Sequence, residues 1–161
     1  MPVDPDLFRG TLSNWASGVT VVTSRRGEDV RGMTASAFCS VSLEPPLILV
    51  CVDKSAIFHD FVAKSGTFAV NILAREQEDV SRACASRKVE ESRRLEGIPY
   101  HEESTGSPVL DHAIGYLDCK VEHTYEGGDH TIFVGRVEAA GARDGDPLVY
   151  FRSAYRGLQY E

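Results

Sequence analysis

Apolar and polar side chains alternate most regularly in the second half of the chain. Every second position from Leu117 to Tyr125 carries an apolar or aromatic side chain or His123, and the intervening positions carry charged or hydroxyl groups. Because successive side chains of a strand point to opposite faces, this pattern predicts a half-buried strand with that set, His123 included, on its inner face. The Gly-Gly-Asp sequence at 127–129 predicts a turn, after which residues 130–139 return as a second strand.

Further strands are predicted along the rest of the chain. Runs rich in β-branched or apolar residues predict strands at residues 18–24, 30–38, 47–52, 67–73 and 147–151. The run at 47–52 is apolar throughout, which is typical of a central strand covered on both faces. Six or seven strands joined by short hairpins predict a mainly β fold, an antiparallel β-barrel with helical additions. The length of 161 residues suits a single domain spanning residues 1–161.

Helical spacing of apolar residues predicts three short helices, at residues 4–17, 55–66 and 76–85. The first helix carries Phe8, Leu12 and Trp15 on one face. Ser55 is expected to cap the second helix, and Gly66 to end it. The highly charged segment 86–96 is expected to form a solvated helix or a mobile excursion outside the core.

Composition and charge exclude several classes of protein. The chain is 42% hydrophobic and 25% charged, as in ordinary globular domains, and its formal net charge is −7. An acidic average surface repels polyanions, which argues against binding of nucleic acid or of an anionic membrane. The longest apolar run, at 45–52, is far shorter than the ~18 residues of a membrane span, and the first six residues do not resemble a secretory signal. We therefore expect a soluble, cytoplasmic protein.

The cysteines and histidines do not form a metal-binding pattern. Cys39, Cys51, Cys84 and Cys119 are widely spaced, and the chain contains no C-x-x-C sequence. We expect free buried thiols rather than a metal clip or a redox pair. No pair of histidines has the spacing of metal ligands on a helix, so no metal site is expected.

The most unusual stretch is residues 32–42, where small side chains and hydroxyl groups predominate. Small side chains leave backbone N–H and C=O groups accessible to a flat ligand. The hydroxyl groups of Thr34, Ser36, Ser40 and Ser42 add donors for a carbonyl-rich or anionic ligand. The same composition also suits a bulged, serine-rich strand that binds nothing, and periodicity does not decide between the two.

A longer block that includes this stretch is specific enough to indicate a family. It reads Met-Thr-Ala-Ser-Ala-Phe-Cys-Ser-Val-Ser-Leu-Glu-Pro-Pro at 33–46 and follows Gly-Val-Thr-Val-Val-Thr at 18–23. Further motifs occupy residues 68–73, 128–132, 135–137 and 147–150. In this order they resemble the flavin reductase family, the reductase components of two-component flavin-dependent monooxygenases. The resemblance spans roughly residues 8–152.

The resemblance implies a fold, a reaction and partners. The fold is an FMN-binding split barrel that forms a homodimer. In the reaction, NADH or NADPH reduces FMN or FAD by hydride transfer, and the reduced flavin diffuses to a partner monooxygenase. The chain has no G-x-G-x-x-G sequence after a strand, so a Rossmann domain is not expected to bind the dinucleotide.

The resemblance also assigns candidate site residues by position. The isoalloxazine ring and ribityl chain are expected to contact Met33, Thr34, Ala35, Ser36, Ala37, Cys39 and Ser40. The flavin phosphate is expected near Lys54, Ser55 and Ala56, with Asp60, Phe61 and Arg87 close by. A phosphate there suits the predicted helix start at Ser55. The nicotinamide is expected beside His130, the candidate catalytic residue, and Tyr155 is expected to help hold the dinucleotide.

Alternative interpretations of the sequence remain. The chain is compatible with a split-barrel protein that binds flavin or haem without reductase activity, or with a dimerisation subunit whose groove is empty. Taken without the resemblance, His130 suits a turn histidine that faces solvent, and Ser55 suits a plain helix cap. The sequence does not distinguish FMN from FAD or NADH from NADPH, and it does not identify the substrate of the partner oxygenase.

Overall fold

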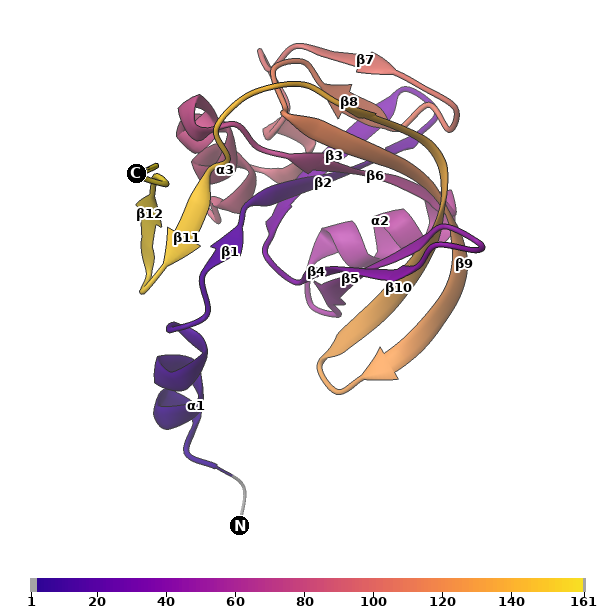
Figure 1. Ribbon diagram of the computed structural model, residues 1–161. Helices are drawn as coiled ribbons and strands as arrows, with labels where there is room; N and C mark the ends of the chain where they lie inside the picture. Colours follow the sequence, from indigo (N-terminus) through magenta and orange to yellow (C-terminus); the bar gives the residue numbers. More distant parts are fainter. Residues whose placement is uncertain (1–2, 161) are drawn as a thin grey trace.

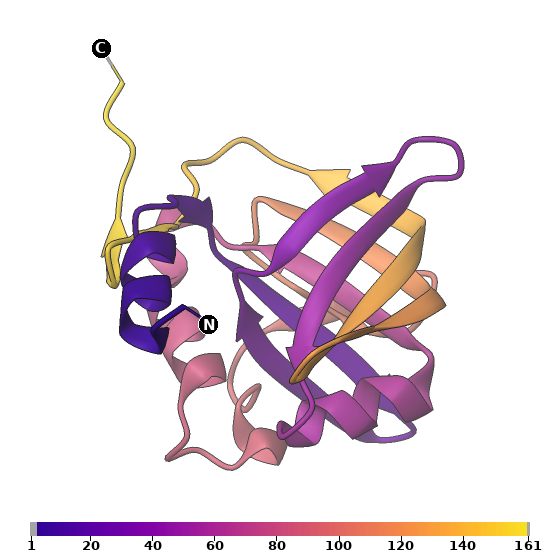
Figure 2. The ribbon, with the colours of Figure 1, turned by 90° about the horizontal axis from the view of Figure 1, so that it is seen from below.

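A curved seven-stranded antiparallel sheet forms the body of the molecule, and the computed structural model describes residues 3–160. Neighbouring strands follow the order β3-β2-β6-β9-β10-β5-β4, and the sheet curls into an open barrel (Figures 1 and 2). This confirms the predicted mainly β, antiparallel architecture. The strands are β2 (Thr20–Arg26), β3 (Asp29–Ala35), β4 (Phe38–Ser42), β5 (Leu47–Asp53), β6 (Thr67–Ile72), β9 (Gly115–Gly127) and β10 (His130–Ala142).

Smaller elements surround this barrel. A three-stranded sheet joins β1 (Ser17–Gly18), β11 (Val149–Phe151) and β12 (Ala154–Arg156), and a two-stranded sheet joins β7 (Tyr100–Glu102) and β8 (Pro108–Leu110). Four strands were not predicted. β7, β8 and β12 have three residues each and no clear alternation, and β4 falls in the run of small and hydroxyl side chains that follows the predicted strand at 30–38. The helices are α1 (Pro5–Leu12), α2 (Ile57–Ser65) and α3 (Glu78–Ala85), with 3₁₀ turns η1 (Arg75–Gln77) and η2 (Glu91–Arg93).

The main core lies between the barrel strands and α2. Phe58 and Val62 of α2 are fully buried against a cluster that includes Phe68 and Phe133 from the strands. The helix ends at Gly66, whose φ of 72° gives the left-handed C-cap that the sequence predicts. Packing against the core therefore fixes the position of α2. The helix begins shortly after the end of β5, so its N-terminus lies near that end of the strand.

A second core lies under α3 and η2, and it corrects the expectation for segment 86–96. Leu95 is only 5% exposed and packs with Cys84, Leu110 and Leu148. The predicted solvation therefore fails at Leu95 and at the Glu91–Arg94 pair, whose side chains are largely buried, although Arg87 and Glu90 are exposed as expected. The charge pattern of the segment did not reveal this burial.

The predicted faces of two strands also need correction. The β9–β10 hairpin extends beyond the barrel (Figure 1), so His123 and Tyr125 are exposed rather than on an inner face. On the other face, Asp118 is fully buried and accepts hydrogen bonds from the backbone N–H and the hydroxyl of Thr105. In β5, burial alternates, so the predicted cover on both faces is wrong: Ile48, Val50 and Val52 are buried and the residues between them are half-buried.

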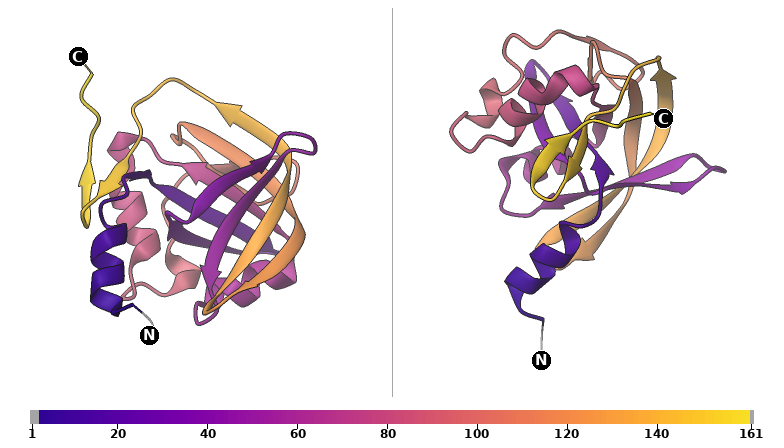
Figure 3. Two further views of the ribbon diagram at one scale, coloured as in Figure 1. Left: turned by 60° about the horizontal axis from the view of Figure 1, so that its bottom comes forward. Right: turned by 60° about the vertical axis from the view of Figure 1, so that its left-hand side comes forward.

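Helix α1 projects from the body of the molecule (Figure 3). It is shorter than predicted, because the chain leaves the helix after Leu12. Asp4 caps it by accepting hydrogen bonds from the backbone N–H groups of Asp6 and Leu7. Its apolar face is uncovered: Phe8 is 56% exposed and Trp15, just after the helix, is 78% exposed.

Candidate functional site

Three adjoining cavities form a groove along the small-residue stretch between β3 and β4. The first has a volume of about 600 Å³ and shares Thr34 and Ala85 with the second, of about 190 Å³. The second shares Ser36 and Tyr150 with the third, of about 340 Å³. The stretch that looked unusual in the sequence therefore borders the groove, rather than packing wholly into the core.

The first cavity opens at the N-terminus of α2, where several predicted residues meet. Met33, Thr34, Ser55, Ala56 and Arg87 all line it. The N-cap of α2 is Ala56, which gives no side-chain hydrogen bond, so the expectation that Ser55 caps the helix is wrong. The first amides of the helix are therefore left without a side-chain acceptor, and together with the Arg87 guanidinium they can bind an anion.

Asp53 organises the turn that precedes α2. Its Oδ1 accepts hydrogen bonds from the backbone N–H of Ser55 (2.7 Å) and from the Ser55 hydroxyl (2.8 Å). These bonds, helped by the nearby charges of His130 and Arg87, hold the pKa of Asp53 below its ordinary value. Sequence reasoning missed Asp53, although it lines the first cavity.

His130 lies at the start of β10, opposite Asp53 in the β5–β10 pairing. Its Nδ1 lies 2.7 Å from Asp129 Oδ1, and its side chain is 40% exposed. His130 does not itself line the first cavity, but the ladder pairing places it beside Asp53, which does. The ring is therefore half-exposed at the edge of the groove.

Hydroxyl groups in the wall of the second cavity are linked by hydrogen bonds. The Thr34 hydroxyl donates to Ser81 O (2.6 Å), and the Ser81 and Tyr155 hydroxyls lie 2.8 Å apart. The edge of the Tyr150 ring meets Tyr155 with 5.3 Å between ring centroids. Tyr155 thus lines the groove as expected. The Thr34 hydroxyl was expected to donate a hydrogen bond to the ligand. It already donates its proton to Ser81 O, so it can only accept a hydrogen bond from a ligand.

The remaining residues of the 33–40 stretch divide between groove and strand. Ser36 and Ala37 are exposed and line the third cavity. Ala35 is buried, and its backbone carbonyl accepts a hydrogen bond from the Thr20 hydroxyl. Cys39 and Ser40 are exposed on β4 but line none of the three cavities.

Three of the residues predicted near a phosphate lie outside the groove. The Lys54 amino group pairs with the Glu126 carboxylate and donates to Gly128 O (2.8 Å). Asp60 lies on α2 with its carboxylate 3.2 Å from the His59 ring. Phe61 is buried, and the guanidinium groups of the two residues Arg26 and Arg31 lie over its ring.

Segment 85–94 supplies groove residues that sequence reasoning missed. Glu91 and Arg94 line the first cavity and form an ion pair with 3.6 Å between Glu91 Oε1 and Arg94 Nη1. Both side chains are about nine-tenths buried. The only sequence feature that could have pointed to this pair is the spacing of the two opposite charges on a helical turn. The same spacing is typical of exposed segments, so it does not identify groove residues. The other residues of this cavity that sequence reasoning missed are Ile57, Cys84, Ala85, Val89 and Glu90.

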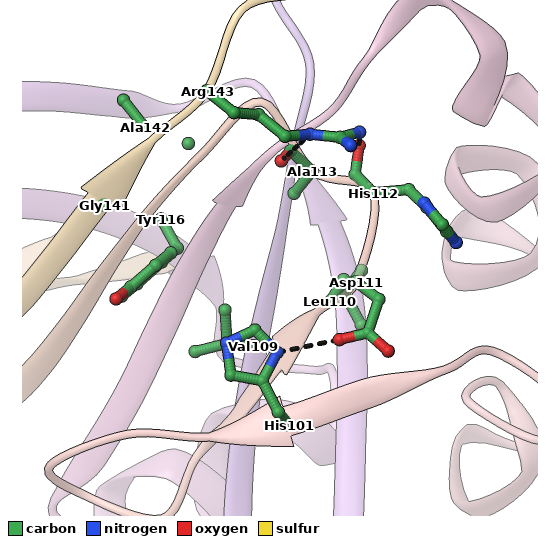
Figure 4. Close-up of a pocket in the computed structure, with 11 residues that line it drawn as sticks. His101, Val109, Leu110, Asp111, His112, Ala113, Tyr116, Gly141, Ala142 and Arg143 are labelled. Carbon is green, nitrogen blue, oxygen red and sulfur yellow. Dashed lines mark hydrogen bonds and ion pairs between the residues drawn. The ribbon is translucent and has the colours of Figure 1, made fainter.

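A separate cavity of about 230 Å³ lies away from the groove (Figure 4). Here His101 Nδ1 lies 2.7 Å from Asp111 Oδ1, and the edge of the His101 ring faces Tyr116. Ser107 does not line this cavity: it is fully buried, and its hydroxyl bonds to the Thr105 and Thr67 hydroxyls. None of the residues predicted for ligand binding lines this cavity.

The cysteines differ in exposure, which corrects the expectation of four buried thiols. Cys84 and Cys119 are buried, and burial raises the pKa of each thiol to about 12. Burial also raises the pKa of Cys51, which is half-buried. Cys39 is exposed. Within residues 3–160, no three His, Cys, Asp or Glu side chains cluster to hold a metal ion.

Alkylation of the native protein should therefore discriminate among the thiols. We expect iodoacetamide at about pH 8 to modify Cys39 first and to leave Cys84 and Cys119 unmodified until the protein unfolds, because a thiolate is the reactive species. Peptide mass spectrometry with and without denaturant measures this order. Rapid native modification of Cys84 or Cys119 would contradict the packing described above.

The fold and the groove define a class: an antiparallel barrel in which a helix N-terminus without a side-chain cap lies beside a cleft of small residues. Residues 12–159 match the model of the flavin reductase like domain, and the chain belongs to this family. No helix in the described part of the chain is long and apolar enough to span a membrane.

Individual relatives align with this chain over nearly its whole length. The reductase component of 4-hydroxyphenylacetate 3-monooxygenase from Thermus thermophilus is 42% identical, covering 95% of this chain and 96% of that protein. An NADH-dependent flavin reductase from a Rhodococcus species is 41% identical, covering 98% and 88%. The NADH:FAD oxidoreductase of Streptomyces globisporus, solved with NAD and FAD fragments, superposes with a TM-score of 0.90 at 35% identity, covering 99% and 97%.

Proposed function

We propose that this protein is an NAD(P)H:flavin oxidoreductase that transfers hydride from NADH or NADPH to FMN or FAD. The observation that carries this proposal is the row of three cavities, linked by shared lining residues, along which the 33–37 stretch, the uncapped N-terminus of α2 and Arg87 lie. The family membership and the NADH-dependent reductase names of its relatives support the same reaction. They favour NADH as the donor.

The residues present fit a flavin. In our proposal, Met33, Thr34, Ser36 and Ala37 border the isoalloxazine ring, because their small or flexible side chains leave room for a flat ring. The amides at the start of α2 and the Arg87 guanidinium hold the phosphate. A bound flavin supplies an acceptor for two electrons as a hydride, and the protein supplies orientation.

The groove also explains how the donor reaches the flavin. Its second and third cavities continue past Ser36, so one side of a ring held there stays open to a nicotinamide. Hydride transfer needs the reacting atoms ~3–3.5 Å apart, which stacking of two flat rings achieves. Backbone N–H groups near Ser36 would donate to a ring edge that gains negative charge. His130 would donate a hydrogen bond to the dinucleotide at the groove edge, and Tyr155, which lines the second cavity, would help to hold it.

Replacing His130 with alanine tests that role. We expect the rate of NADH oxidation to fall about tenfold, as for the loss of one hydrogen bond in the reacting complex, with the flavin Kd nearly unchanged. Steady-state oxidation and flavin titration measure the two quantities. His123→Ala, an exposed histidine on the same hairpin, is the control. An equal loss of rate and of flavin affinity would remove the proposed role.

We propose that the reduced flavin passes by diffusion to a separate monooxygenase in the cytoplasm. The relative from Thermus thermophilus is named as the reductase component of such a system, which supports this place in the reaction sequence. Flavin reduction by this chain must then be followed by consumption of reduced flavin with oxygen in another protein. Gel filtration of the protein with flavin tests whether colour stays with the chain or leaves it.

We also propose that the protein is a homodimer. Apolar side chains on projecting elements are exposed, among them Leu7 and Phe8 on α1, Leu43 in the β4–β5 turn and Tyr125 on β9. Contact with a second copy of the chain would remove these apolar groups from water. Sedimentation equilibrium should give twice the mass of one chain, and a monomer at micromolar concentration would contradict the proposal.

The proposed activity is tested by following NADH and NADPH oxidation with added FMN or FAD. We expect flavin-dependent turnover, faster with NADH. Absence of turnover with every combination would refute it. A split-barrel protein that only binds flavin or haem would keep a bound flavin oxidised under anaerobic NADH, and the reductase names of the relatives do not favour that alternative.

A further inference from the structure

The side chain of Lys54 binds the turn of the β9–β10 hairpin, which leads directly into His130. Its amino group donates a hydrogen bond to Gly128 O (2.8 Å) and pairs with the Glu126 carboxylate. Its backbone N–H donates to Asp129 O (3.0 Å). Lys54 lies directly after β5, in a different part of the chain, and contacts three of the four residues that precede His130.

The turn has little means of fixing its own conformation. Residues 127 and 128 are both glycine, which has no side chain and adopts many backbone conformations, and Gly128 has a φ of 73°. The hairpin also extends beyond the barrel (Figure 1), and residues 122–129 are exposed, so core packing does not hold the turn. The bonds from Lys54 supply a restraint that neither the turn sequence nor the core provides.

The conformation of the turn decides how the His130 ring is oriented. Asp129 Oδ1 lies 2.7 Å from His130 Nδ1, so a shift of the turn moves the group that orients the ring. The backbone of His130 is held separately, because it pairs with Asp53 at the end of β5. A displaced turn therefore reorients the imidazole without moving the strand.

These contacts give Lys54 a different role from the one that its charge suggests. Lys54 does not line the first cavity, where we place the flavin phosphate. Its amino group already bonds to a carboxylate and to a carbonyl, and hydrogen bonds from a charged group are stronger than those between neutral groups. Turning toward a phosphate would break both contacts.

We propose that Lys54 is a positioning residue for the reduced dinucleotide, because it holds the turn at 128–129 in the conformation that presents His130 to the donor. The inference rests on the proposed reductase function and on the contact of His130 with the dinucleotide. It goes beyond that function by assigning a residue that acts through another and contacts neither the donor nor the flavin. Loss of the Lys54 side chain should therefore impair use of the donor and leave flavin binding intact.

Replacing Lys54 with glutamine in the full chain tests this role. We expect kcat/KM for NADH to fall about fivefold, less than the loss expected for His130→Ala, since the ring is misplaced rather than removed. The Kd of FMN should stay within twofold. Lys54→Arg, which can still donate to Gly128 O and pair with Glu126, should restore kcat/KM to within twofold of the native value. Lys64→Gln is the control, because it removes an equal charge from an exposed position in the last turn of α2.

A double variant isolates the route of the effect. In the His130→Ala background, Lys54→Gln should cause no further loss of kcat/KM, because the residue through which it acts is gone. Multiplication of the two losses would overturn the inference. So would a Kd that rises for FMN but not for riboflavin, since Lys54 would then bind the phosphate.

The remaining outcomes separate this inference from the function on which it rests. An unchanged kcat/KM in Lys54→Gln, in a protein that oxidises NADH with flavin, overturns the inference alone. A loss that Lys64→Gln shares also overturns it, and so does a changed mass of Lys54→Gln in sedimentation equilibrium, because the effect would then come from assembly. If the native protein shows no flavin-dependent oxidation, the proposed function fails, and this inference fails with it.

Discussion

Truncation of Phe68 to alanine is expected to lower the free energy of unfolding by about 3–5 kcal/mol, a large part of the ~5–15 kcal/mol available to a domain. The Phe68 ring is fully buried among the barrel strands, and a cavity would remain after its removal. Urea denaturation measures the change. Leu158→Ala, at a 44% exposed position, should change the stability by less than ~0.5 kcal/mol.

The same ring explains why residue 135 is glycine. A Cβ at Gly135 would lie 2.5 Å from Phe68 Cζ and 2.9 Å from Cys119 Cβ. Gly135→Ala should therefore destabilise the native protein by about 1–3 kcal/mol, and by clearly less when Phe68 is leucine or alanine. Simple addition of the two effects in the double variant would show that the crowding does not come from this contact.

Substitution of Arg87 by glutamine is expected to raise the Kd of FMN about 10- to 100-fold, because a hydrogen bond to a charged group contributes about 1.5–3 kcal/mol. Arg87 lines the first cavity with Ser55 and Ala56, where we place the phosphate. Fluorescence titration measures the change in Kd.

Two controls confine that effect to the phosphate. Riboflavin, which has no phosphate, should bind the Arg87→Gln variant and the native protein equally well. Lys88→Gln removes an equal charge from the neighbouring exposed residue, which does not line the cavity, and should leave FMN binding unchanged. A similar loss with riboflavin or with Lys88→Gln would assign Arg87 a general electrostatic role instead.

The strands of the barrel could be predicted from the sequence because each buries a repeating set of side chains. The alternation around residue 120 identified β9, and β-branched runs identified β2 and β6. The alternation does not show at which residue a strand extends beyond the barrel. His123 continues the pattern of Leu117 and is nevertheless exposed, since burial depends on strands distant in sequence.

The groove was predictable mainly where one stretch of chain forms it. Met33, Thr34, Ser36 and Ala37 line the groove from one short stretch, and the resemblance identified them together with the buried Ala35. Lys54 shows the opposite case: its cationic side chain suited a phosphate, but in the fold it reaches Glu126 on the neighbouring hairpin. Trp15 and Arg152 line the same cavity because the segment after α1 hydrogen-bonds to the β11–β12 turn, which no local pattern reveals.

A crystal structure of the protein soaked with FMN tests the central claim most directly. We expect the ring to lie along residues 33–37 with its phosphate at the N-terminus of α2 and Arg87, and with one face uncovered toward the third cavity. A ring bound elsewhere, such as in the His101 cavity, or a groove that admits no ring at all, would contradict the account.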